Sequence, residues 1–105
     1  MSEFEKFSVL MSIYEADDPD HFDIALKSVW NDQHLKPDQI VLVCDGKLTS
    51  ALDSVVLKWS ESLRSKLTVV RFKSNLGLAK ALNHGLDFCR HDIVVRMDSD
   101  DISLP

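Results

Sequence analysis

The chain alternates short apolar runs with longer segments in which apolar residues return every three or four positions. The apolar runs cover residues 7–13, 39–44, 67–72 and 92–97. Nearly continuous apolar stretches of this length are typical of strands that are buried on both faces of a parallel sheet. The pattern therefore predicts four strands.

The segments between these runs show the spacing of amphipathic helices. In the first one Phe22, Ala25, Leu26 and Val29 fall on one face, and similar stripes occupy residues 52–63 and 78–89. Asp18 before a proline predicts the start of the first helix, and Thr49 or Ser50 is a candidate cap for the second.

Strands that alternate with helices predict a β-α-β-α-β-α-β order. Such units pair their strands in parallel through right-handed crossovers and place helices on both faces of the sheet. We expect an α/β Rossmann-like domain that spans residues 1–105. Cys44 and Cys89 show no metal-binding or disulfide spacing, so two buried thiols are expected.

Charge and the start of the chain narrow the classes of function. The formal net charge is -5 without a basic cluster, which argues against a nucleic-acid partner. The acidic start lacks a long apolar segment, so we expect neither a signal peptide nor a membrane span in this piece. A cytoplasmic location is predicted.

Polar residues follow three of the predicted strands, at the sheet edge where open parallel sheets bind ligands. They are Ser12, Tyr14 and Glu15 after the first strand, Asp45 after the second, and residues 98–101 (DSDD) after the fourth. Clustered carboxylates repel one another, and a divalent cation with a preference for oxygen ligands relieves that repulsion. In extended backbone Asp98 and Asp100 point to the same side, where a metal ion and a diphosphate can meet.

Each of these residues also has a purely structural interpretation. Residues 98–101 can form a solvated turn, and Tyr14 can cover the sheet edge instead of stacking on a base. Asp45 can accept a hydrogen bond from a base or form an Asx turn with Gly46. Asn75 can shape the turn before the third helix, although amides at that helix start can also face an anion. The metal site is favoured because all these groups follow strands of one sheet.

Four motifs, in this order, resemble family 2 glycosyltransferases of the GT-A fold, and in particular those that build bacterial surface polysaccharides. The motifs are residues 8–14 (SVLMSIY), 39–46 (QIVLVCDG), 75–83 (NLGLAKALN) and 96–101 (RMDSDD). The resemblance covers nearly the whole chain. It implies the nucleotide-sugar-binding part of a metal-dependent, inverting enzyme that transfers a sugar from a donor, UDP-linked by expectation, to a glycan or lipid-linked acceptor.

The resemblance also assigns roles to individual residues. It implies that Ser12, Tyr14 and Asp45 hold the base, and that Asp98 lies near the ribose and the metal. Asp100 would be a ligand of the metal, either Mn²⁺ or Mg²⁺. Glu15 and Asn75 complete the candidate nucleotide-binding set, although Glu15 replaces an asparagine that is common at this position in the family.

The family's catalytic base and acceptor site belong to a second half of the enzyme, so the resemblance implies a general base beyond Pro105. We therefore expect the isolated chain to bind the donor without transferring sugar, and to self-associate through an exposed sheet edge. The full-length protein is expected to lie at the inner face of the membrane. A nucleotidylyltransferase-like domain and a non-catalytic interaction fragment remain as alternatives, whereas a dehydrogenase is rejected because the strand end at Tyr14 lacks a glycine-rich loop.

Overall fold

A computed structural model describes residues 6–31 and 36–99 of the chain. The strands are β1 (Phe7–Ile13), β2 (Gln39–Cys44), β3 (Leu67–Arg71) and β4 (Ile93–Asp98). The helices are α1 (Pro19–Trp30), α2 (Ser50–Leu63) and α3 (Leu78–Leu86), and a short 3-10 turn, η1 (Arg64–Lys66), precedes β3. In this part of the chain, no helix has both the length and the apolar character that crossing a bilayer requires.

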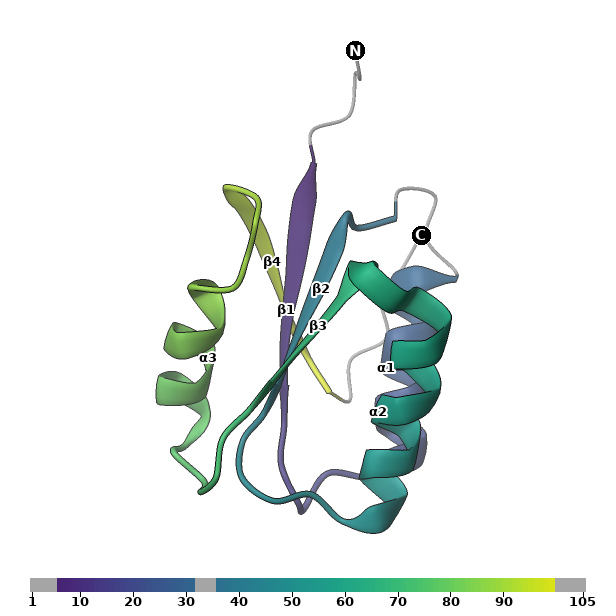
Figure 1. Ribbon diagram of the computed structural model, residues 1–105, viewed down its shortest axis with the longest axis vertical. Helices are drawn as coiled ribbons and strands as arrows, with labels where there is room; N and C mark the ends of the chain where they lie inside the picture. The colour runs from purple at the N-terminus through teal and green to yellow at the C-terminus, as the bar shows by residue number, and fades with distance from the viewer. Residues whose placement is uncertain (1–5, 32–35, 100–105) are drawn as a thin grey trace.

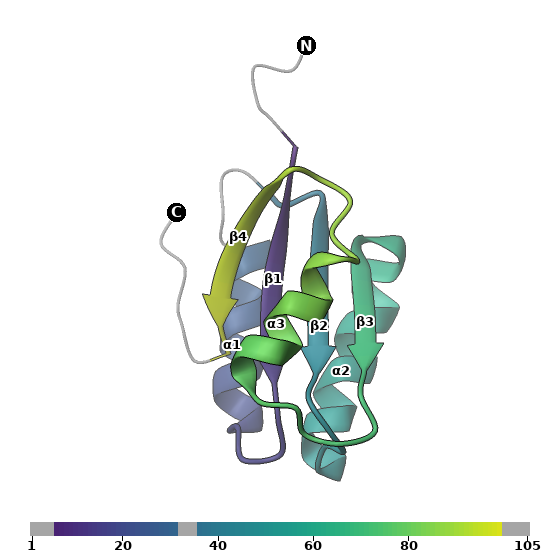
Figure 2. The ribbon, with the colours of Figure 1, turned by 90° about the vertical axis from the view of Figure 1, so that its left-hand side faces the viewer.

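The four strands form one parallel sheet in the order β3-β2-β1-β4. Helices α1 and α2 cover one face, and α3 covers the other (Figures 1 and 2). The predicted α/β class, with helices on both faces of a parallel sheet, is confirmed. The first strand therefore lies inside the sheet, between β2 and β4.

Each face of the sheet has its own hydrophobic core, because successive side chains of a strand point to opposite faces. On the α1 and α2 face, the core includes Val9 and Met11 of β1 together with Phe22 of α1. On the α3 face it is smaller and includes Leu10 of β1 and Ala81 of α3. At Gly85, α3 lies so close to the sheet that an added Cβ would come within 2.6 Å of the Leu10 side chain.

The two predicted helix starts are observed as capped N-termini. Asp18 Oδ1 accepts hydrogen bonds from the amides of Asp20 and His21, at 2.8 and 3.1 Å. These bonds lower the pKa of Asp18, because they stabilise its charged form. For α2 the cap is Thr49, whose hydroxyl accepts a hydrogen bond from the amide of Leu52.

The structure corrects several boundaries and one burial prediction. Helix α3 ends at Leu86, and tight turns carry the chain through Phe88 to Cys89, so Cys89 is half-buried although its spacing continues the helical stripe. Cys44 is buried as predicted. β3 stops one residue early at Arg71, and β4 is shifted forward by one residue to Ile93–Asp98.

A buried glutamine joins the strands at the amino end of the sheet. Gln39, the first residue of β2, accepts hydrogen bonds from the Ser8 hydroxyl and the Arg90 amide at its Oε1 atom. Its Nε2 atom donates to the Thr68 hydroxyl and the Phe88 carbonyl. One side chain thus connects β1, β3 and the segment between α3 and β4.

Candidate nucleotide-binding site

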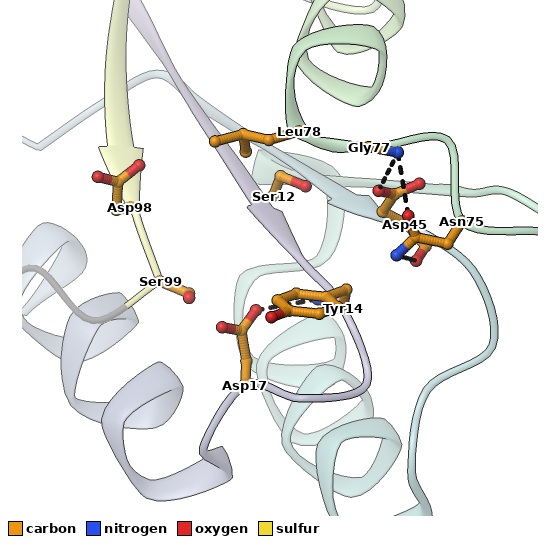
Figure 3. A pocket seen from close by; sticks show the side chains of 9 residues that line it. All are labelled: Ser12, Tyr14, Asp17, Asp45, Asn75, Gly77, Leu78, Asp98 and Ser99. Atoms are coloured by element: carbon orange, nitrogen blue, oxygen red, sulfur yellow. Dashed lines mark hydrogen bonds between the residues drawn. The ribbon is translucent and has the colours of Figure 1, made fainter.

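A hollow lies at the carboxyl ends of β1, β2 and β4. Strand β1 has β2 on one side and β4 on the other, and the chain reaches these neighbours through helices on opposite faces of the sheet. Such a switch point opens a crevice in which doubly wound proteins bind ligands. The cavity has a volume of about 450 Å³ and is lined by Ser12, Tyr14, Asp17, Asp45, Asn75, Gly77, Leu78, Asp98 and Ser99 (Figure 3).

Strand register brings Ser12 and Asp98 together. The two residues are partners across the parallel β1–β4 pair, so their side chains point to the same face of the sheet. In Figure 3, Ser12 lies between Asp98 and Asp45. The Arg96 guanidinium forms an ion pair with Asp98, with 3.5 Å between Nη2 and Oδ1.

Tyr14 and Asp17 form the part of the cavity that follows β1. Tyr14 is 45% exposed, so its ring is accessible for stacking. Asp17 Oδ2 accepts a hydrogen bond from the Tyr14 amide at 2.9 Å, and the Asp17 amide donates to the Tyr14 carbonyl. Asp17 was not predicted, and its only signal in the sequence is an acid four residues after Ile13, the last residue of β1. Glu15, which was predicted, is exposed and does not line this cavity.

Asp45 is buried and bonded to the loop that precedes α3. Its Oδ1 accepts a hydrogen bond from the Leu76 amide at 2.7 Å, and its Oδ2 accepts one from the Gly77 amide at 3.0 Å. The side chain therefore does not form the Asx turn with Gly46 that was one alternative. Each carboxylate oxygen still has a second lone pair that can accept a hydrogen bond from a ligand.

Asn75 shapes the same loop. Its Oδ1 accepts a hydrogen bond from the Gly77 amide, and its Nδ2 donates to the Asp45 carbonyl. The amides of Leu76 and Gly77, just before α3, donate to the Asp45 carboxylate.

The carboxylates at the cavity suit a divalent metal ion that takes part of its coordination from a bound substrate. Among residues 6–31 and 36–99, no three His, Cys, Asp or Glu side chains gather as a metal cage. Asp98, at the end of β4, is one of the carboxylates that line the cavity, and its side chain is 55% exposed. Mg²⁺ commonly binds through one or two carboxylates together with substrate phosphates, and Asp98 fits that mode.

Two of the predicted site features fall outside the described residues. The second predicted metal ligand, Asp100, is one of them. The other is the general base, which was expected beyond Pro105, and Pro105 itself also lies outside the described residues. Both assignments therefore stay predictions, and the structure assigns no catalytic base among residues 6–31 and 36–99.

The buried thiol next to Asp45 is not a nucleophile. Burial raises the pKa of Cys44 to about 11, so the thiolate is scarcely populated at neutral pH.

Residues 8–105 match the family model described as glycosyl transferase family 2. The chain belongs to this family. It is 46% identical over 99 residues to "Amylovoran biosynthesis glycosyltransferase AmsE" of Erwinia amylovora, and this match covers 94% of the chain and 36% of that protein. It is 45% identical over 98 residues to "UDP-Gal:alpha-D-GlcNAc-diphosphoundecaprenol beta-1,3-galactosyltransferase" of Escherichia coli, with 93% of the chain and 34% of that protein covered. The chain thus spans about a third of the length of these curated relatives.

Solved structures share the fold. The mannosyltransferase PcManGT from Pyrobaculum calidifontis, in complex with GDP-Man and Mn²⁺, superposes with a TM-score of 0.77 at 25% identity, covering 93% of this chain and 28% of that one. Residues 1–349 of S. aureus TarS, in complex with UDP, superpose with a TM-score of 0.74 at 27% identity, covering 90% and 27% of the two chains. These similarities confirm the GT-A architecture.

Proposed function

We propose that the cavity at the carboxyl ends of β1, β2 and β4 binds the nucleoside diphosphate of a nucleotide-sugar donor. The observation that carries the proposal is the convergence of Ser12, Tyr14, Asp45 and Asp98 on one cavity at the switch point of the sheet. An exposed ring suits a base, and hydroxyl and carboxylate groups suit the ribose and base edges.

Uracil is the proposed base. The relative from E. coli is named for a UDP-Gal donor, and the TarS structure contains UDP, whereas PcManGT was solved with GDP-Man. In this proposal Tyr14 stacks on the base, and Ser12 and Asp45 hydrogen-bond to the nucleoside. Asn75 contributes to nucleotide binding from the loop before α3. Glu15 lies outside the cavity and is the least supported of the proposed nucleotide-binding residues.

Asp98 is the proposed link between the protein and the diphosphate. The carboxylate would contact the ribose and share a divalent cation with Asp100, and Mn²⁺ is supported by its presence in the PcManGT complex. When bound, Mn²⁺ or Mg²⁺ supplies positive charge that stabilises the departing diphosphate. Without it, the carboxylate of Asp98 would repel the diphosphate.

For the whole protein, we propose transfer of a hexose to a lipid-linked or glycan acceptor with inversion at the anomeric carbon. The acceptor is supported by the diphosphoundecaprenol in the name of the relative from E. coli. An acceptor on a lipid carrier also supports our prediction that the enzyme works in the cytoplasm at the inner face of the membrane.

Calorimetric titration with UDP tests the proposal. We expect UDP to bind in the presence of Mn²⁺, to bind at least tenfold more weakly in EDTA, and to be preferred over GDP. Asp100→Ala should abolish the metal-dependent part of the affinity without unfolding the protein. Affinity that does not change in EDTA would contradict the bridging metal, and absence of UDP binding in Mn²⁺ would contradict the proposed function.

A further inference from the structure

We propose that Asp45 is a positioning residue that holds the loop before α3 in its binding-competent place, in addition to any bond it makes to the nucleotide. The inference rests on the proposed function for its effect on affinity. The clamp itself is a property of the free protein and is tested without nucleotide.

The clamp is a pair of hydrogen bonds between distant parts of the chain. Both oxygens of the Asp45 carboxylate accept a backbone amide from the loop, and the side chain is only 4% exposed. Hydrogen bonds to an ionised acceptor are stronger than bonds between neutral groups, above all when water is excluded. Asp45 therefore fixes Leu76 and Gly77, and with them the cavity wall formed by Gly77 and Leu78 (Figure 3).

Helix α3 has no cap of its own. Its N-cap residue is Gly77, which has no side chain to accept the orphan amides at the helix start. The Asp45 carboxylate places a negative charge at this end, where the helix dipole favours it. Asp45 bonds the amides of Leu76 and Gly77, which precede the first turn, so it supports this end of the helix from the end of β2 without bonding the first-turn amides.

Backbone conformation at both sides of the clamp fits this interpretation. Gly46 and Gly77 have φ values of +95° and +92°, in the region that favours glycine. A Cβ added at Gly46 would lie 3.0 Å from the Asn75 backbone nitrogen. Gly46 does not line the cavity, so a substitution there displaces the loop without removing a side chain from the nucleotide site.

The first arm of the experiment measures amide hydrogen exchange by NMR in the nucleotide-free protein. Asp45→Asn keeps one acceptor oxygen and loses the other, so we expect the Leu76 and Gly77 amides to exchange at least tenfold faster. Asp17→Asn is the matched control, because Asp17 lines the same cavity and bonds only to its own turn. Unchanged exchange of the Leu76 and Gly77 amides in Asp45→Asn would overturn the clamp.

The second arm measures the affinity for UDP in Mn²⁺, and Gly46→Ala separates positioning from direct contact. If Asp45 positions the loop, Gly46→Ala should speed exchange at Leu76 and Gly77 and weaken UDP binding at least threefold, with the far-UV circular dichroism of the wild type. If Asp45 acts only by contact, Gly46→Ala will bind UDP as the wild type does, which would overturn the functional part of the inference. Should Gly46→Ala not fold, Leu76→Pro serves as the second variant, because it removes the amide that donates to Asp45 Oδ1 at a residue that does not line the cavity. The same criteria then apply, with exchange read at the Gly77 amide.

The two arms keep the two proposals distinguishable. Faster exchange in Asp45→Asn, in a protein whose wild type does not bind UDP, supports the clamp and contradicts the proposed function. Normal UDP binding by the wild type, with unchanged exchange of the Leu76 and Gly77 amides in Asp45→Asn, supports the proposed function and contradicts the clamp.

Discussion

The two ends of the parallel sheet both carry polar side chains, but they use them differently. At the amino end, Gln39 is 1% exposed, and both atoms of its amide group are hydrogen-bonded within the protein. At the carboxyl end, the side chain of Asp98 is 55% exposed beside a cavity. The first arrangement satisfies a polar group completely within the protein, whereas the second leaves a carboxylate that pairs with Arg96 largely accessible to solvent.

The difference separates polar residues that hold strands together from polar residues that are accessible to a ligand. A buried amide with all its partners in place stabilises a specific arrangement of strands, and it has no capacity left for a ligand. An exposed carboxylate contributes little to stability and can exchange water for a cation or a hydroxyl group. Asp45 combines the two features, since it is buried and bonded yet lines the cavity.

The largest effect is expected at the amino end. Gln39→Leu removes the hydrogen-bond partner of four groups at once: the Ser8 hydroxyl, the Arg90 amide, the Thr68 hydroxyl and the Phe88 carbonyl. A buried polar group left without a partner costs about 1–3 kcal/mol. Since the neighbours can relax toward water, we expect a loss of about 3 kcal/mol of unfolding free energy, measured by urea denaturation.

Ser8→Ala is the graded control for that measurement. It removes one hydrogen bond to Gln39 and leaves the other partners in place, so its cost should be about 1 kcal/mol. UDP affinity of the folded Gln39→Leu protein should equal that of the wild type. Lost affinity in the folded variant would break the proposed division between the two ends.

At the carboxyl end of the sheet we expect a smaller change in free energy, and we expect it in UDP affinity rather than in stability. Asp98→Asn keeps the shape and removes the charge, so UDP affinity in Mn²⁺ should fall about tenfold, or about 1.4 kcal/mol. Unfolding free energy should stay within about 0.5 kcal/mol of the wild type, because the side chain is exposed. Asp87→Asn, at the far end of α3, is the charge-matched control and should bind UDP normally. A large loss of stability in Asp98→Asn would identify Asp98 as a structural residue.

The smallest expected effect concerns Asp23 of α1, an acid that belongs to neither end of the sheet. Burial alone would raise the pKa of Asp23, but hydrogen bonds from the side chains of Lys58 and Trp59 outweigh it, and the pKa is lowered. A lowered pKa adds stability above the unfolded-state value and loses it as the pH falls through the folded-state value. The stability difference between wild type and Asp23→Asn should therefore close below pH 3.8, which is the ordinary pKa of the group.

Acid titration of thermal unfolding measures this difference. The Asp23 side chain is 34% exposed, and so we expect a gap below about 1 kcal/mol at neutral pH. A gap that persists unchanged at low pH would show that the ionised carboxylate is not the stabilising form.

Much of the fold could be predicted because strands that are buried on both faces of the sheet appear in the sequence as continuous apolar runs. The bounds of β1 and β2 follow directly from their apolar runs, and Asp18 marked the start of α1 through its capping chemistry. The end of α3 could not be read in the same way. Cys89 continues the helical spacing, but a turn rather than a helix places it against the core.

The site was less accessible to sequence reasoning, because it depends on which strands are neighbours. That Ser12 lies beside Asp98 follows from the β1–β4 register, which neither motif encodes. Asp45 was recognised as a strand-end acid, while its bonds to Leu76 and Gly77 depend on how two loops meet in space. The roles of Ser12, Tyr14, Asp45 and Asp98 in nucleotide binding stay predictions until the titrations are done.

The central place of β1 also sets an order of assembly during synthesis. β1 emerges first, and β2 and β3 with their helices can pack against one of its edges while the rest of the chain is still being made. The other edge must wait for β4, whose residues lie near the opposite end of the chain. Pairings between such distant segments close large loops and form slowly. Because β4 carries Asp98, we expect the cavity at the carboxyl end of the sheet to be completed only after β1, β2 and β3 have paired.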